Sequence, residues 1–266
     1  MIFLDNVVMS FKERIIDVWN KIENVVLVNH ACIACRKEIP DGLEFSMCEN
    51  CEKSLEIISG NLCEICGEEI LEGNRLCDSC KNTKYEFDIS RSYAKYLDIE
   101  ANIVKRFKYS SKKYYAKYIA KLMATNKAYF DAVDYLTFVP IGRKRHRERG
   151  FNQAEEIALM LGEIMNIPVL DLLEKTGNEK HQAGLTQKER RENLSGTIRI
   201  KDETKALIKN TTIMIIDDVF TTGSTLSECA KVIKSVRAYK PKRVLCYTFA
   251  KTDYNSSNNG QNLQNN

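Results

Sequence analysis

Residues 213–225 read IMIIDDVFTTGST, an apolar run followed by two adjacent aspartates, two further apolar residues and a glycine set among hydroxyl side chains. The run at 213–216 is short and rich in β-branched residues, which predicts a buried strand of a parallel sheet. Asp217 and Asp218 fall at the carboxyl end of that strand. Apolar side chains then recur at intervals of three and four, which predicts a helix; they are Leu226, Cys229, Val232, Ile233 and Val236. The stretch therefore predicts a strand, a loop and a helix of an α/β fold.

The loop between this strand and helix has the composition of a phosphate site. Ligands of open α/β sheets bind beyond the carboxyl ends of the strands, and a helix amino terminus offers free N–H groups and a positive dipole to an anion. Gly223 permits close approach of the backbone, and the hydroxyls add donors. The two aspartates should face a group that favours negative charge, such as a sugar diol or Mg²⁺. The composition of this stretch is therefore consistent with a single site that binds a phosphate, a ribose and a metal ion.

Two other interpretations of the stretch are possible. An apolar strand that ends in two aspartates is also typical of a Walker B strand, but the chain has no Gly-Lys dipeptide and hence no G-x-x-x-x-G-K-[ST] loop. This excludes an ordinary P-loop NTPase. A helix N-cap with incidental acids explains the hydroxyl groups, but it does not explain the joint pattern.

The stretch resembles the 5-phosphoribosyl-1-pyrophosphate (PRPP) loop of type I phosphoribosyltransferases, in which a strand, two acidic residues and two apolar residues precede T-T-G-[ST]. In that superfamily the acids hold the ribose hydroxyls and the loop surrounds the 5′-phosphate, with Mg²⁺ accompanying PRPP. By position, the resemblance implies that Asp217 and Asp218 bind ribose. It implies that the 5′-phosphate is bound by Thr221, Thr222, Gly223, Ser224 and Thr225.

Length and composition indicate one sizeable core and a small additional module, since the chain has 266 residues, 44% of them hydrophobic, and four prolines. The net charge of +4 does not by itself argue for nucleic acid. No apolar stretch reaches about 18 residues, so we expect no membrane span. The first residues lack a basic start and a small-residue cleavage site, so we expect no signal peptide and a cytoplasmic protein.

The two ends of the chain differ in character from the rest. Residues 1–28 have apolar side chains spaced alternately by four and three, which predicts an amphipathic helix that packs on its own protein or pairs with a partner helix. Residues 253–266 are polar, nearly uncharged and rich in asparagine, which predicts a disordered tail.

Eight cysteines form four C-x-x-C pairs, which predict two structural Zn²⁺ sites. Two such pairs complete a tetrahedral shell of four thiolates, which leaves no open position for catalysis. A disulfide framework or a redox pair fits less well, because a reducing compartment is expected and four pairs exceed what exchange chemistry uses. The spacing permits tandem or interleaved pairing. The predicted ligands are Cys32, Cys35, Cys48, Cys51, Cys63, Cys66, Cys77 and Cys80.

Residues 135–165 repeat the order of strand, loop and helix, as YLTFVPI, GRKRHRERG and FNQAEEIALMLGEIM. Guanidinium groups at the carboxyl end of a parallel strand suit a pyrophosphate, which Arg grips through two parallel hydrogen bonds. An ordinary solvated basic face is the alternative. The candidate pyrophosphate ligands are Arg143, Arg145, Arg147 and Arg149.

Residues 180–196, KHQAGLTQKERRENLSG, follow a short predicted strand at 168–175 and have no clear period. Long irregular segments of compact domains are often lids, and Gln182, Arg190 and Arg191 would then close on the phosphates. A surface loop and helix is the alternative.

Residues 103–123 carry seven Lys and Arg and no acid, interleaved with Phe and Tyr. Single-stranded nucleic acid suits this composition, because rings stack on bases and cations follow phosphates. A helix that packs its aromatic rings on the sheet explains the composition equally well.

The order of paired C-x-x-C ribbons, FKY, VPIGRKRHRERGFNQA, HQAGLTQKERRENLSG and IIDDVFTTGST resembles the ComF family of bacterial proteins, which join a double zinc ribbon to a phosphoribosyltransferase-like domain and are linked to natural competence. The resemblance covers roughly residues 30–250. Its R-x-R-G-F-N-Q core at 147–153 is more distinctive than the PRPP loop. Lys180 and His181 stand where many relatives have Pro or Thr, so the lid departs from the family pattern.

The resemblance implies an α/β, type I phosphoribosyltransferase-like domain with a mainly parallel sheet, preceded by a small double zinc-ribbon module. The expected boundaries are an amphipathic helix at 1–28, the ribbons at 29–84, the phosphoribosyltransferase-like domain at 85–252 and the tail at 253–266. It further implies PRPP binding or 5-phosphoribosyl transfer with Mg²⁺, in competence and DNA uptake. No residue identifies the acceptor or a catalytic group.

A non-catalytic accessory protein for DNA uptake is the main alternative. Such a protein would bind single-stranded DNA or a helicase-like competence translocase through the zinc module and the Lys/Tyr segment, and would keep the PRPP site as a sensor or relic. An ordinary base-salvage transferase is disfavoured, because such enzymes need no zinc ribbons.

Overall fold

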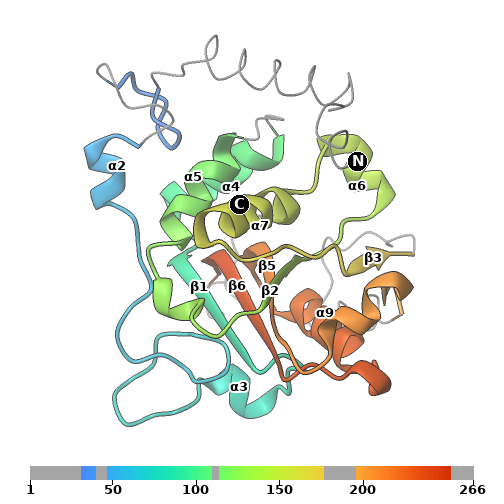
Figure 1. Ribbon diagram of the computed structural model, residues 1–266. Coiled ribbons are helices and arrows are strands. Elements are labelled where there is room, and N and C mark those ends of the chain that lie inside the picture. Colours follow the sequence, from blue (N-terminus) through green and yellow to red (C-terminus); the bar gives the residue numbers. More distant parts are fainter. Residues whose placement is uncertain (1–30, 40–46, 110–113, 177–195, 253–266) are drawn as a thin grey trace, which may run out of the picture.

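In the computed structural model, the described residues are 31–39, 47–109, 114–176 and 196–252 (Figure 1). The predicted amino-terminal helix, the asparagine-rich tail and nearly all of the predicted lid, including Gln182, Arg190 and Arg191, lie outside these ranges. So do Lys112 and Lys113 of the basic segment.

A four-stranded parallel sheet forms the centre of the molecule. Its strands are β1 (Ile89–Lys95), β2 (Tyr135–Phe138), β5 (Thr212–Phe220) and β6 (Arg243–Lys251), in the order β1-β6-β5-β2, and each neighbouring pair is parallel. The residues of β5 from Thr212 to Ile216 are all buried, as expected for a strand covered on both faces. The predicted parallel α/β sheet is confirmed.

Helices cover both faces of this sheet (Figure 1). On one face lie α4 (Asp98–Tyr109), α5 (Tyr114–Met123) and α7 (Gln153–Met165), and on the other lies α9 (Ser224–Lys234). Each helix buries an apolar stripe, such as Leu226, Cys229 and Ile233 of α9. The sheet and these helices form the core that holds the carboxyl ends of the strands in place.

Shorter elements complete the described chain. They are α2 (Glu49–Lys53), α3 (Asp78–Asn82), η1 (Lys127–Tyr129), α6 (Arg143–Arg149), β3 (Leu173–Lys175), β4 (Ile198–Ile200), η2 (Asp202–Ile208) and η3 (Arg237–Tyr239). The antiparallel pair β3–β4 stands apart from the central sheet. The strand predicted at 168–175 is therefore reduced to β3 and one parallel bridge between Val169 and Leu136.

Three local boundaries differ from the expectation. The arginine segment predicted as a loop is the short helix α6, which begins after Gly142 and ends at Gly150 in the left-handed region. Strand β5 runs past the aspartates to Phe220, because β6 continues beside it and pairs with it up to Lys251. Helix α9 begins at Ser224, inside the predicted loop.

The two halves of the zinc module contact different parts of the sheet domain. In the first half, the carbonyl oxygen of Ile33 lies 3.5 Å from the hydroxyl of Tyr115 on α5. The second half lies along the outer edge of β1, where Ser90 N donates to the Ile65 carbonyl at 2.7 Å. Figure 1 accordingly shows α2 and α3 well apart from each other.

Candidate functional site

The paired acids lie in β5 where the strands of the sheet end. Asp218 is buried and Asp217 is half-buried. The backbone N–H of Asp218 donates to Asp217 Oδ1 at 2.8 Å. Burial and then the neighbouring Asp218 carboxylate raise the pKa of Asp217 to about 7, although Lys108 and Arg145 oppose the rise. Two carboxyl groups thus share a confined position in which a cation or a diol would relieve their repulsion.

Lys108 of α4 forms an ion pair with Asp218, a role that the sequence did not predict for it. Its Nζ lies 2.8 Å from Asp218 Oδ2, and the two side chains are only 22% and 10% exposed. Burial lowers the pKa of Lys108, but the carboxylates of Asp218 and Asp217 outweigh burial and raise it, so the ammonium stays charged. Lys108 is the lysine of the FKY motif that the family resemblance includes, but the sequence does not show which residue it contacts.

The predicted phosphate loop joins β5 to the first turn of α9. Thr222 Oγ1 and Ser224 Oγ lie 2.8 Å apart, and Ser224 N lies 3.4 Å from the same Thr222 oxygen. Because the first amides of a helix lack partners within the helix, they point at the loop and favour an anion there. The loop residues Thr221, Thr222, Gly223, Ser224 and Thr225 therefore lie together at the helix amino terminus, as the sequence predicts.

Gly223 is the one position of this loop where the backbone requires glycine. Its φ is +69°, in the left-handed region, and it forms the N-cap of α9. A Cβ atom at this position would lie 2.6 Å from Phe220 Cζ and 2.8 Å from a ring carbon of Tyr85. The loop is thus held closely between two aromatic rings.

Two of the four candidate arginines act electrostatically on this site, one on Asp217 and one on Lys108. Arg145 is half-buried and lowers the pKa of Asp217, and Arg149 is half-buried and opposes the rise in the pKa of Lys108, so both act on this site electrostatically. Arg143 and Arg147 are exposed on α6. The candidate pyrophosphate ligands therefore divide into two pairs: Arg145 and Arg149 are half-buried and act on this site, whereas Arg143 and Arg147 are exposed to solvent.

The residues after Arg149 hold this guanidinium in position. Arg149 donates to Gln153 Oε1 at 2.9 Å, and Gln153 is only 2% exposed. Asn152 caps α7 by accepting from Ala154 N at 3.1 Å and donates to the Val139 carbonyl at 3.0 Å. The Gln153 Nε2 is buried and has no hydrogen-bond partner among the described residues.

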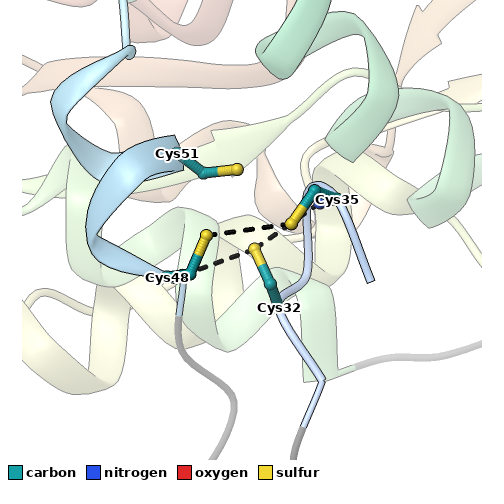
Figure 2. A group of neighbouring side chains, drawn as sticks. All are labelled: Cys32, Cys35, Cys48 and Cys51. Atoms are coloured by element: carbon teal, nitrogen blue, oxygen red, sulfur yellow. Dashed lines mark hydrogen bonds between the residues drawn. The ribbon is translucent and has the colours of Figure 1, made fainter. Parts of the chain in front are cut away.

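The eight cysteines form two tandem clusters, which answers the question of pairing that the spacing leaves open. They are Cys32, Cys35, Cys48 and Cys51, and then Cys63, Cys66, Cys77 and Cys80. Within each cluster all four sulfur atoms lie within 4.8 Å of one another. Figure 2 shows the first cluster, with the sulfur atoms converging from a turn and from the start of α2.

The geometry of both clusters fits a tetrahedral zinc ion. Zn–S bonds of about 2.3 Å place neighbouring sulfur atoms about 3.8 Å apart. The observed Sγ–Sγ distances are 3.7 Å between Cys35 and Cys48 and 3.6 Å between Cys66 and Cys77. Backbone amides also point at the sulfur atoms, as in Cys48 N to Cys32 Sγ at 3.4 Å. Such amides stabilise thiolates, which are the form that binds metal.

The basic and aromatic segment divides between packing and exposure. Phe107 and Tyr115 are buried, which supports the packing interpretation for these rings, whereas Tyr109 is 80% exposed. Lys105, Lys117 and Lys121 are exposed on α4 and α5. Among the described residues, no helix has the length and apolar character needed to cross a membrane.

Comparisons with known proteins agree with this architecture. The double zinc ribbon domain family matches residues 24–81. Competence protein F of Haemophilus influenzae is 26% identical over 219 residues, which cover 78% of this chain and 92% of that protein. Competence protein ComFC of Bacillus subtilis is 28% identical over 195 residues, which cover 70% of this chain and 77% of that protein.

Among solved structures, a hypoxanthine phosphoribosyltransferase of Staphylococcus aureus aligns with 53% of this chain and 65% of its own, at 15% identity and a TM-score of 0.33. The zinc-ribbon match and the two competence proteins, aligned over most of the chain, confirm the resemblance drawn from the sequence: the chain carries a double zinc ribbon and is similar over most of its length to the competence proteins F and ComFC.

Proposed function

We propose that the protein binds PRPP with Mg²⁺ at the carboxyl edge of its sheet and acts in DNA uptake as a phosphoribosyltransferase-like protein. The observation that carries the proposal is the meeting of three features at one strand end. The acids Asp217 and Asp218, the loop at the start of α9, and the guanidinium groups near the acids lie together there. The proposed role in DNA uptake is based on the similarity to relatives that are named as competence proteins.

Each feature has a distinct task in this proposal. The carboxylates accept hydrogen bonds from the ribose hydroxyls, and the amides of α9 hold the 5′-phosphate. Arg145 and Arg149 bind the pyrophosphate, because guanidinium groups match phosphate oxygens in pairs. Mg²⁺, when bound, neutralises part of the pyrophosphate charge. The protein's contribution to ribosyl transfer is thus electrostatic.

Calorimetric titration tests this assignment. We expect PRPP with Mg²⁺ to bind and to raise the free energy of unfolding by about 2.7 kcal/mol at a hundred times its dissociation constant. Asn at both Asp217 and Asp218 should weaken PRPP and ribose 5-phosphate alike. Arg149→Ala should weaken PRPP selectively, while Arg143→Ala, on the exposed side of the same helix, serves as the matched control. Absence of PRPP binding by the wild type contradicts the proposal.

The same titration bears on catalysis. If PRPP binds and pyrophosphate is released with an added base, the protein is a transferase and that base is an acceptor. If PRPP binds and no base tested releases pyrophosphate, we propose instead a sensor role for the site in DNA uptake.

Single-stranded DNA is a second candidate ligand, and the exposed side of α4 and α5 favours it. Lys105, Lys117 and Lys121 are exposed there, as is the ring of Tyr109. Changing the three lysines to Ala should weaken DNA binding and reduce the log–log salt slope by about 0.7 for each lost phosphate contact. The control removes three exposed lysines at the amino-terminal ends of β5 and β6, namely Lys209, Lys240 and Lys242. Equal salt slopes for the two variants would show that Lys105, Lys117 and Lys121 make no contact with DNA phosphates.

The domain boundaries are part of the proposal. We place the double zinc ribbon at 29–84 and the PRPP-binding domain at 85–252. A cytoplasmic location and a competence translocase as partner are further expectations of the same function.

A further inference from the structure

The carboxyl ends of three neighbouring strands bring the second zinc ribbon close to the phosphate loop at 221–225. The second ribbon is the half of the zinc module that holds Cys63, Cys66, Cys77 and Cys80. Phe220 of β5 is in register with Lys251 of β6, and Lys251 is in register with Lys95 of β1. Phe220 directly precedes the phosphate loop, whereas the β1 edge carries the second ribbon. Lys251 is therefore placed between the loop and the ribbon.

Lys251 contacts both of these neighbours. Its side chain is only 5% exposed. Its ammonium lies 3.5 Å from the carbonyl oxygen of Cys66, 3.2 Å from Glu68 Oε2 and 3.8 Å from the ring centroid of Phe220. Cys66 belongs to the second metal cluster. A cation over an aromatic face is attracted by the negative charge of the ring face, so Lys251 links a residue of the second cluster to the residue that precedes the loop.

Tyr85 makes a second link from the same side. It follows α3 in the chain, and its hydroxyl donates to the Thr222 carbonyl at 3.2 Å. Its ring lies 6.3 Å from that of Phe220, in an edge-on arrangement. Both rings bound the space in which Gly223 sits. A shift of either ring thus changes the space available to the loop.

The first ribbon has different contacts. Its Ile33 carbonyl meets Tyr115 of α5, on the helical face of the sheet domain. The two metal clusters therefore differ in what they support, although their sequences are alike.

We propose that the second zinc ribbon positions the phosphate loop through Lys251 and Tyr85, so that metal at the second cluster determines the affinity for 5-phosphoribosyl ligands and metal at the first does not. The inference rests on the proposed function of the loop. Lys251 and Tyr85 are positioning residues, because they act on the ligand through the loop.

Two matched cysteine variants test the role of the metal. Cys48 and Cys77 each form the N-cap of a short helix, α2 and α3, in equivalent positions of the two ribbons. Zinc analysis of Cys48→Ser and Cys77→Ser should show loss of about one equivalent from each. Titration with ribose 5-phosphate should then show an affinity near that of the wild type for Cys48→Ser and one weaker by about tenfold for Cys77→Ser.

A second pair of variants tests the link with both metal sites intact. Lys251→Met should also weaken ribose 5-phosphate and PRPP by about tenfold, and Lys251→Arg, which keeps a cation over the ring, should restore most of the affinity. The control is Lys95→Met, because Lys95 makes an ion pair with Glu69 of the same ribbon at 2.6 Å. Inorganic pyrophosphate alone should bind Lys251→Met as it binds the wild type, since its ligands are Arg145 and Arg149.

The outcomes separate the two levels of the proposal. If the wild type binds neither PRPP nor ribose 5-phosphate, the proposed function and this inference fall together. If the wild type binds both and Lys251→Met matches Lys95→Met in affinity, the inference alone is wrong. If Cys77→Ser does not fold, as thermal unfolding would show, the comparison of Lys251→Met with Lys95→Met decides the question.

Discussion

Replacing Gly223 with alanine tests how closely the phosphate loop is held. The φ of +69° places this residue in the left-handed region, where a residue other than glycine costs about 1–2 kcal/mol. The added Cβ would also lie 2.6 Å from Phe220 and 2.8 Å from Tyr85. Because contacts this short force neighbouring rings to move, an overpacking cost of about 1–3 kcal/mol is added. We expect Gly223→Ala to lose about 2–5 kcal/mol of unfolding free energy.

Gly60 provides the matched control. Its φ is +83°, and a Cβ there would meet no atom within 4 Å. Gly60→Ala therefore carries only the backbone cost of about 1–2 kcal/mol. Urea unfolding of the two variants, at fixed zinc, measures the difference. In a thermal scan, each kcal/mol should appear as a shift of about 2–4 °C in Tm for a chain of this size.

The binding assay completes this test. We expect Gly223→Ala to bind ribose 5-phosphate more weakly than the wild type, because the loop must move to make room for the methyl group. Gly60→Ala should bind it normally. If the two variants lose the same unfolding free energy and both bind ribose 5-phosphate normally, the loop is not confined by the two rings and the reasoning is refuted.

Three further predictions concern the acids, their lysine and the metal. Because the pKa of Asp217 is raised from 3.8 to about 7, its contribution to stability is greatest below pH 4 and is lost as the pH rises through 7. PRPP affinity needs the carboxylate and should therefore increase over pH 6–8. Titration calorimetry at several pH values should show this rise in affinity for the wild type and a smaller one for Asp217→Asn. Lys108→Met should lower the unfolding free energy by about 1–3 kcal/mol, because the buried Asp218 loses its partner, and a double-mutant cycle with Asp218→Asn should give a coupling near 1 kcal/mol, whereas additive effects would argue against a working ion pair. Metal analysis should find about two zinc per chain, and strong chelation should unfold the ribbons, since zinc binding supplies folding energy to so small a module; a zinc content near zero in folded protein would exclude both sites.

The sequence by itself determined the local units of this protein. The period of apolar residues indicated the buried strand at 213–216 and the helix after Gly223, because secondary structure repeats over a few residues. The C-x-x-C spacing indicated zinc, because chelation by two thiolates depends on a single tight turn. The hydroxyl residues around Gly223 indicated a phosphate loop, because such a loop is likewise formed by a few consecutive residues. Within these units, only the ends were misjudged, since neighbouring strands and caps set where each element stops.

Tertiary structure alone decided which distant residues meet. The sequence allowed tandem or interleaved cysteine pairing, and the contacts of one ribbon with α5 and the other with β1 accompany the tandem arrangement. The sequence offered four equivalent arginines, and only the position of α6 in the fold lets Arg145 act on Asp217 and Arg149 act on Lys108. The sequence did not show the contacts of Lys108 or Lys251, since each side chain contacts an element remote in the chain. Such contacts depend on how helices and strands pack, and no short-range pattern encodes that packing.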